Sequence, residues 1–402
     1  MTSQASRPLN ASLVRLMALA TGLSVASNYY AQPLLAVIAR QVGLSTANAG
    51  YIVTTAQISY ALGLLCLVPL GDLLERRRLI VVMTVFAAVG LAVSATAPGV
   101  FWLLAGTAIT GLFSVVAQIL VPFAATLAAP EQRGKVLGTV MSGLLLGILL
   151  ARTVAGAIAS LGSWRTVYGC AALAMLVLAL ALSRALPVHQ TSARLSYPRL
   201  LGSVWQLYRE EPVFRLRSLL GALSFCAFAI LWTSLTFLLS DAPYHYSPAS
   251  IGLFGLVGAA GALAANQAGR LADRGKSGLT TTLGLLGMLL AWLGMSLAAH
   301  SLVLLIVGIL LMDLAAQSVH ISNQSQIYRL RPEARSRFTA GYMTCYFIGG
   351  SVGSSLAAAV YPHGGWVGVS LIATGVVAVA LGVWLFSQRR GSVHAGGEQA
   401  RR

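Results

Sequence analysis

The residues of this sequence that could do chemistry are few, and they are polar groups inside long apolar segments. The segment from about 302 to 328 carries Asp313, which is followed by Gln317, His320 and Gln324 after four, seven and eleven residues. This spacing places all four side chains on one face of a helix. Asp313 is roughly 17 Å along that helix, near the middle of a bilayer core. Burial disfavours a charged carboxylate, so Asp313 is a candidate proton-binding group.

Arg152 is a second charge inside an apolar segment. It lies roughly 12 Å from the outer end of its helix, close to Asp313 in depth, so the spacing allows a salt bridge between them. We interpret Asp313 as a proton-coupling site and Arg152 as its partner or as an anion-binding charge, with His320 as a candidate proton relay. The alternatives are a fixed ion pair that only holds helices together, and a His320 that is a hydrogen-bonded wall of a cavity.

Other polar and aromatic side chains are candidates for contact with a small-molecule substrate. Polar residues recur at helical spacing in the first and fourth apolar segments as well, and a helix face of this kind is either buried or turned to water. Packing explains the two tyrosines of the group equally well. The candidate substrate-binding residues are Asn28, Tyr29, Tyr30, Gln32, Gln118, Trp232, Gln317 and Gln324.

The elements that must hold these groups are apolar helices. Of the 402 residues, 57% are hydrophobic and 9% are charged, whereas soluble domains carry about 25% charged residues. This composition excludes soluble enzymes, nucleic-acid binders and disordered proteins. The net charge of +17 comes from basic residues in short gaps between apolar runs, which indicates membrane topology rather than binding to nucleic acid.

Twelve segments are long enough to cross a bilayer. Their apolar runs are continuous rather than alternating, which excludes a β-barrel and predicts an all-α membrane protein with 12 transmembrane helices. The expected spans are about 13–38, 48–70, 79–97, 100–128, 136–160, 166–186, 217–240, 249–271, 279–299, 302–328, 339–361 and 366–387.

The basic residues predict the orientation of these spans. Nearly all of them fall on one side if both termini are cytoplasmic, and Arg40 and Arg165 fall on the other. The first apolar run continues past the small residues 25–27, so we expect a span there rather than a cleaved signal peptide. The four cysteines lie within apolar runs and show no metal-binding spacing, so no metal and no cofactor are expected.

Two segments of the sequence recur about half a chain apart. Residues 71–78 read Gly-Asp-Leu-Leu-Glu-Arg-Arg-Arg and residues 269–276 read Gly-Arg-Leu-Ala-Asp-Arg-Gly-Lys, which places Asp72 and Asp273 201 positions apart. Pro-Glu-x-Arg at 130–133 and at 332–335 recurs with an offset of 202. Landmarks at one period predict two six-helix halves related by duplication.

The repeated loop resembles the Gly-x-Leu-Ala-Asp-Arg-x-Gly-Arg-Arg signature of the major facilitator superfamily. Residues 28–33, Asn-Tyr-Tyr-Ala-Gln-Pro, look like a twelve-helix bacterial, drug-efflux-like branch. The first copy departs at Val68, Leu73 and Glu75, and Arg152 stands where the drug–proton antiporters carry a proline. The resemblance implies that the first, fourth, seventh and tenth helices line a central cavity.

An aspartate beside arginines at a helix end can bridge helices and bias two conformations of a carrier. This predicts a gating role for Asp72, Arg76, Arg77, Asp273 and Arg274. The alternative is that the arginines only anchor the topology.

The predicted organisation has four parts. They are an N-terminal six-helix bundle at 1–186, a cytoplasmic linker with an amphipathic, surface-lying helix at 187–216, a C-terminal six-helix bundle at 217–388, and a basic cytoplasmic tail at 389–402.

We therefore expect a proton-coupled secondary transporter that works by alternating access and exports small amphipathic organic compounds by proton antiport. It has no GxxxxGK[ST] loop for ATP, and we expect no enzyme activity. The expected partners are a small-molecule substrate, protons and the lipid bilayer, with no nucleic acid, and the expected form is a monomer in the bacterial inner membrane. One alternative is uptake of a small polar or anionic metabolite by proton symport. Another is a non-transporting membrane sensor or scaffold.

Overall fold

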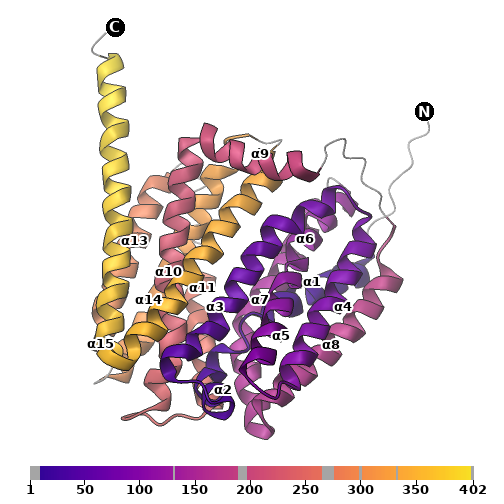
Figure 1. Cartoon of the computed structure of the whole chain (residues 1–402). Helices are drawn as coiled ribbons and strands as arrows, with labels where there is room; N and C mark the ends of the chain where they lie inside the picture. Colours follow the sequence, from indigo (N-terminus) through magenta and orange to yellow (C-terminus); the bar gives the residue numbers. More distant parts are fainter. Residues whose placement is uncertain are drawn as a thin grey trace, which may run out of the picture. The chain divides into compact units, whose positions relative to one another are not determined.

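The computed structural model describes residues 10–129, 132–188, 197–264, 276–297, 301–331 and 334–399. Within these ranges the chain forms helices and no strands (Figure 1), which confirms the all-α prediction. The helices are α1 (Ala11–Ala26), η1 (Gln32–Leu34), α2 (Leu35–Val42), α3 (Thr46–Cys66), η2 (Val68–Asp72), α4 (Arg76–Ala95), α5 (Val100–Phe113), α6 (Val116–Leu127), α7 (Arg133–Leu161), α8 (Trp164–Ala185), α9 (Tyr197–Glu210), α10 (Pro212–Ser240), α11 (Pro248–Ala264), α13 (Ser277–Met295), α14 (Leu302–Ile327) and α15 (Arg335–Gln399).

Nine helical segments of the described residues are long and apolar enough to cross a membrane. Two shorter apolar helices, Ala11–Ala26 and Pro248–Ala262, fall in the first and eighth predicted spans. The last segment, Arg335–Arg389, covers the eleventh and twelfth predicted spans in one run, and Gly365 inside it has non-helical backbone angles. The multi-span architecture is as expected, although the helices do not match the twelve predicted spans one for one.

The chain divides into two compact units. Unit 1 comprises Met1–Gln206 and Leu239–Leu256, and unit 2 comprises Leu207–Leu238 and Val257–Arg402. In unit 1, α1 packs on α7, and α4 packs on α5 and α8; in unit 2, α13 packs on α14 and α15. The predicted limits of the two six-helix bundles stay a prediction.

Two predicted spans are each broken into two helices within unit 1. The first span is interrupted between α1 and η1, where Pro33 lacks a backbone N–H and its ring crowds the preceding turn. The fourth span is interrupted between α5 and α6, and Ser114 caps the end of α5. The two breaks meet, because the Oγ atoms of Ser27 and Ser114 are 2.7 Å apart. Ser27 donates to the Ser24 carbonyl, so Ser114 is the donor to Ser27.

The stripes of small residues allow close helix packing. A Cβ atom at Gly143 or Gly147 of α7 would clash with the α1 backbone at Ala18 or Gly22. In unit 2, Gly349 meets the backbone of Ala222 in the same way. Small side chains at these positions let two backbones approach in lipid, where shape fit replaces the hydrophobic effect as the driving force.

The linker helix differs from its prediction. We expected an amphipathic helix on the membrane surface, and α9 forms at Tyr197–Glu210. Its apolar residues Leu200, Val204 and Leu207 are buried in the protein. In unit 2, the Tyr208 hydroxyl donates to the Gly341 carbonyl at 2.7 Å. The apolar face therefore packs on protein rather than on lipid. The expected tail differs too, since α15 continues as a helix to Gln399.

Candidate functional site

Asp313 of α14 is buried inside unit 2, with 4% of its surface exposed. It faces α11, where an added Cβ at Gly258 would lie 3.0 Å from Asp313 Oδ1. The same point lies 2.7 Å from Cζ2 of Trp232, so the carboxylate and the indole edge converge on one glycine. An added Cβ at Gly261 would lie 3.1 Å from Asp313 Cβ. The carboxylate therefore lies in a notch that two glycines of α11 leave open.

The other polar residues of α14 face α15 rather than Asp313. His320 Nδ1 lies 3.0 Å from the Tyr342 hydroxyl, and its ring packs on Tyr346 at 4.7 Å. Gln324 Nε2 lies 4.0 Å from the sulfur of Met343, and Gln317 is partly buried. Seven residues of helix separate Asp313 from His320 by roughly 10 Å, which is too far for direct proton exchange. A relay through His320 stays a prediction.

Arg152 of α7 is buried in unit 1, with 3% of its surface exposed. Its Nε donates to Gln32 Oε1 at 2.6 Å, and its guanidinium lies 4.9 Å from the centre of the Tyr29 ring. An added Cβ at Gly255 would lie 3.0 Å from Arg152 Cβ. The structure thus brings together three of the predicted residues, because the turn after α1 presents Tyr29 and Gln32 to α7.

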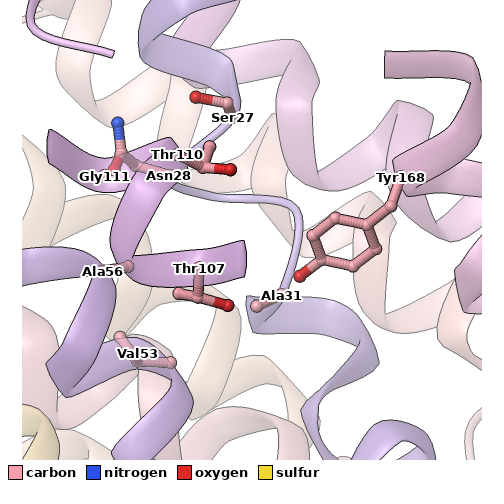
Figure 2. Close-up of a pocket in the computed structure, with 9 residues that line it drawn as sticks. All are labelled: Ser27, Asn28, Ala31, Val53, Ala56, Thr107, Thr110, Gly111 and Tyr168. Atoms are coloured by element: carbon pink, nitrogen blue, oxygen red, sulfur yellow. The ribbon is translucent and has the colours of Figure 1, made fainter. Parts of the chain in front are cut away.

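Asn28 lines a small cavity of unit 1 (Figure 2). The lining residues are Ser27, Asn28, Ala31, Val53, Ala56, Thr107, Thr110, Gly111 and Tyr168. The cavity volume of about 10 Å³ is about what one water molecule needs. This pocket is too small for an organic substrate in this conformation. Of the other predicted residues, Tyr30 is buried and Gln118 lies beside the Tyr60 hydroxyl.

The predicted proton-coupling pair joins residues of different units. Arg152 belongs to unit 1 and Asp313 to unit 2. Each is held by neighbours of its own unit, so a salt bridge between them stays a prediction. Within the described residues, no group of three metal-binding side chains converges.

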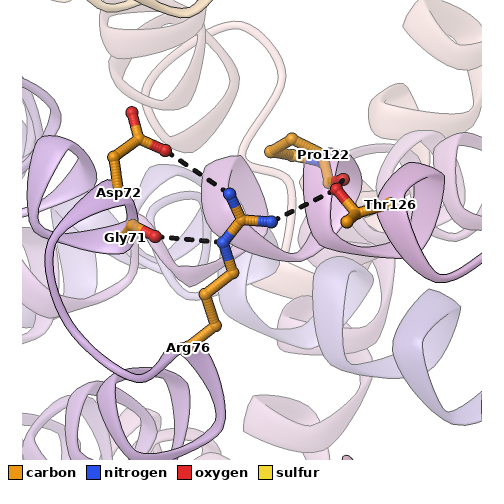
Figure 3. A network of polar contacts seen from close by, with 5 residues as sticks. All are labelled: Gly71, Asp72, Arg76, Pro122 and Thr126. Carbon is orange, nitrogen blue, oxygen red and sulfur yellow. Dashed lines mark hydrogen bonds and ion pairs between the residues drawn. The ribbon is translucent and has the colours of Figure 1, made fainter. Parts of the chain in front are cut away.

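The first repeated loop forms a polar network within unit 1 (Figure 3). Arg76 donates from Nε to the Gly71 carbonyl at 3.0 Å, from Nη1 to Thr126 Oγ1 at 3.2 Å, and from Nη2 to Asp72 Oδ1 at 3.4 Å. Its guanidinium also lies 5.7 Å from the centre of the Phe123 ring. One arginine thus ties the end of η2 and the start of α4 to α6.

The remaining gating candidates have other partners or lie outside the described residues. Arg77 donates from Nη2 to the Ser183 carbonyl near the end of α8. Glu75 caps α4 by accepting from the backbone N–H groups of Arg77 and Arg78 at 2.8 and 2.9 Å. Asp273 and Arg274 fall outside the described ranges, so the second copy of the loop stays a prediction.

Sequence reasoning missed two features of unit 2. Gly258 and Gly261 belong to a run of glycines at three-residue spacing, a signal for close packing, but the sequence does not show that it faces Asp313. Arg217 was expected to be a topology anchor, and the structure instead buries it within unit 2, with 6% exposed.

The comparisons with known proteins settle the family. The family model of the Major Facilitator Superfamily matches residues 17–319 and 244–401. The chain belongs to the major facilitator superfamily. It is 57% identical over 376 residues to the "Uncharacterized transporter YgaY" of Escherichia coli O157:H7, covering 94% of this chain and 95% of the relative. It is 32% identical over 375 residues to the "Probable transporter SCO4007" of Streptomyces coelicolor, covering 92% and 84%.

Solved structures show the same fold. A bacterial homologue of the human lysosomal transporter Spinster, in an inward-facing and occupied conformation, superposes with a TM-score of 0.76. The match covers 96% of this chain and 98% of that one at 13% identity, so it speaks for the fold alone. The predicted family and fold class are confirmed. The protein is a multi-pass membrane transporter of a family that handles small-molecule substrates.

Proposed function

We propose that this member of the superfamily is a proton-coupled secondary transporter that exports small amphipathic organic compounds by proton antiport. Asp313 is the proton-binding group of this proposal. The single observation that carries it is the burial of this carboxylate: among the described residues, Asp313 is the one acidic side chain in the buried core. The side chains of Asp72 and Asp241 are 47% and 59% exposed.

The surroundings of Asp313 support a group that changes its protonation state. An ionised carboxylate in an apolar span is costly, whereas a protonated one can remain buried. The glycine notch of α11 and the ring of Trp232 keep bulky side chains away from one side of the carboxyl group. A movement of α11 or of Trp232 would therefore change the access of water to Asp313. Alternating access would then couple loss and gain of a proton to the two sides of the membrane.

Arg152 supports the runner-up function, uptake of a small anionic metabolite by proton symport. It is a buried cation whose Nε bond goes to the neutral oxygen of Gln32. A guanidinium in such a setting can recognise the carboxylate or phosphate of a substrate. In the antiport proposal, Tyr29, Gln32 and Trp232 contribute apolar and polar surface to substrate binding.

The remaining parts of the proposal follow from the sequence and the family. The protein acts as a monomer in the bacterial inner membrane, with both termini in the cytoplasm, and it is not an enzyme. The Asp72–Arg76 network biases the two conformations of the carrier, and the second loop, with Asp273 and Arg274, does the same. The distribution of the arginines supports this orientation.

The test is flux in proteoliposomes with and without an imposed pH gradient, using a panel of cationic, neutral and anionic organic compounds. Wild type is compared with Asp313→Asn, and Asp241→Asn is the matched control because it removes an exposed carboxylate. We expect gradient-driven flux in wild type and in Asp241→Asn, and loss of the gradient dependence in Asp313→Asn.

The direction of flux separates the two transport functions. Compound movement against the proton flow means antiport, and movement with it means symport. If Asp313→Asn keeps full gradient-driven transport, the proton site lies elsewhere. If no compound of the panel moves in wild type although the protein binds some of them, the sensor alternative gains.

A further inference from the structure

Arg217 is a buried cation without an acidic partner. It lies in the second turn of α10, and its Nη1 donates to Thr281 Oγ1 at 2.8 Å and to Asn323 Oδ1 at 3.2 Å. The ring centre of Trp384 lies 4.7 Å from its guanidinium carbon. Across the described part of the chain, no carboxylate forms an ion pair with Arg217. All of these contacts lie within unit 2.

The cluster around Arg217 has more hydrogen-bond donors than acceptors. Only Nη1 of the guanidinium donates to a described residue, which leaves Nε and Nη2 without an acceptor there. The amide nitrogen of Asn323 is also buried without an acceptor, and Asn323 is fully buried. Buried donors without acceptors and a buried charge without a counter-ion are both costly. An anion would satisfy the two together.

The geometry of the guanidinium selects the kind of anion. Nε and Nη2 form the side edge of the planar group, and this edge offers two parallel N–H bonds to the two oxygens of an oxyanion. Arg217 is the sixth residue of α10, roughly 7.5 Å from its first residue. The headgroup region of a bilayer is about 5–8 Å thick on each side, so this depth is that of lipid phosphates. Trp384 is a residue type that is enriched at the same level.

We propose that Arg217, with Asn323 beside it, forms a binding site for a phosphate group in unit 2. Thr281 and the Trp384 ring orient the guanidinium, and its Nε–Nη2 edge receives the phosphate oxygens. The source is either the headgroup of an anionic phospholipid or free phosphate. This site is separate from Asp313 and does not depend on the proposed transport reaction.

The experiment measures the thermal unfolding midpoint of the full-length protein in detergent. One arm adds phosphatidylglycerol in mixed micelles, and a second adds inorganic phosphate against sodium chloride of equal ionic strength. The variants are wild type, Arg217→Gln and Arg215→Gln. Arg215 is the matched control because it is exposed two residues away and donates to the carbonyls of Tyr208 and Arg209.

We expect phosphatidylglycerol to raise the midpoint of wild type and of Arg215→Gln equally, because a ligand that binds the folded state stabilises it. Arg217→Gln should need at least tenfold more lipid for the same rise. If inorganic phosphate gives the same Arg217-dependent rise, the ligand is free phosphate; if it gives none, the ligand is the lipid headgroup. If neither addition depends on Arg217, the proposal is wrong and Arg217 only joins helices.

A second variant keeps the test decisive if Arg217→Gln does not fold. Arg217→Lys retains the charge but lacks the planar edge with two N–H groups. We expect its response to phosphatidylglycerol and to inorganic phosphate to weaken about tenfold while the control stays unchanged. A response equal to that of wild type would overturn the assigned site.

Discussion

Replacing Gly258 by alanine tests whether the notch beside Asp313 is as tight as the structure shows. The new Cβ would lie 2.7 Å from Cζ2 of Trp232 and 3.0 Å from Oδ1 of Asp313. Carbon atoms pack best at about 3.5–4.0 Å, so the indole would have to move by about 0.8 Å or more. Trp232 is 2% exposed, so its ring has little free space into which it could move.

The expected magnitude combines two opposing terms. Overpacking of a tight core costs about 1–3 kcal/mol. Glycine to alanine inside a helix stabilises it by about 1 kcal/mol. A matched control isolates the first term: Gly382 lies in α15 of the same unit, and an added Cβ there meets nothing within 4 Å. Gly382→Ala should therefore show the helix gain alone, and the two variants should differ by about 1–3 kcal/mol.

The assay is the free energy of unfolding in detergent, followed by the pH dependence of gradient-driven flux in proteoliposomes. We expect Gly258→Ala to be less stable than Gly382→Ala. It should also shift the pH of half-maximal flux, because the displaced indole changes the surroundings of Asp313. The shift should vanish in an Asp313→Asn background, where the titrating group is absent.

Two results would refute this reasoning in different ways. If Gly258→Ala is stabilised as much as Gly382→Ala, α11 and α14 are not in close contact at this point. If Gly258→Ala is destabilised but the pH profile is unchanged, the notch is real and Asp313 does not titrate during transport.

Three further predictions concern other contacts. Glu75→Ala removes the cap of α4 and should destabilise the protein by about 1 kcal/mol in thermal or denaturant unfolding; no change would mean that other groups cap the helix. Arg152→Lys loses the Nε bond to Gln32 and the flat contact with the neighbouring ring, so stability and transport should both fall, and lysine performing as well as arginine in unfolding and flux assays would contradict the geometry. Tyr208→Phe removes the bond to the Gly341 carbonyl and should cost about 0.5–1.5 kcal/mol of unfolding free energy, whereas an unaltered value would mean that α9 is not held there.

Much of the fold could be predicted from local patterns. The apolar runs gave the positions of most helices, because a segment that crosses a bilayer must be long and apolar whatever its neighbours are. The repeated loop identified the family, since Asp72 and Asp273 recur at half the chain length. The prediction was weakest where helices are interrupted. The turn after α1 has a proline as its signal, whereas the break at Ser114 has none that sequence periodicity reveals.

The candidate site was predicted residue by residue but not as an arrangement. Spacing placed Asp313 and His320 on one helix face. In the structure they have different neighbours, because a face about 10 Å long meets α11 at one end and α15 at the other. The grouping of Arg152 with Gln32 and Tyr29 needed the turn after α1, which no count of helical positions provides.

The sequence by itself determined the membrane class, the helical fold, the duplication and the identity of the rare buried charges. These follow from composition and spacing along one chain, because the bilayer imposes the same length and polarity on every span. Only the tertiary structure decided that Asp313 faces glycines of α11, that Arg217 is buried among Thr281, Asn323 and Trp384, and that the apolar side of α9 packs on protein. Such contacts depend on which helices approach closely, and close approach between helices in lipid is a matter of complementary shape.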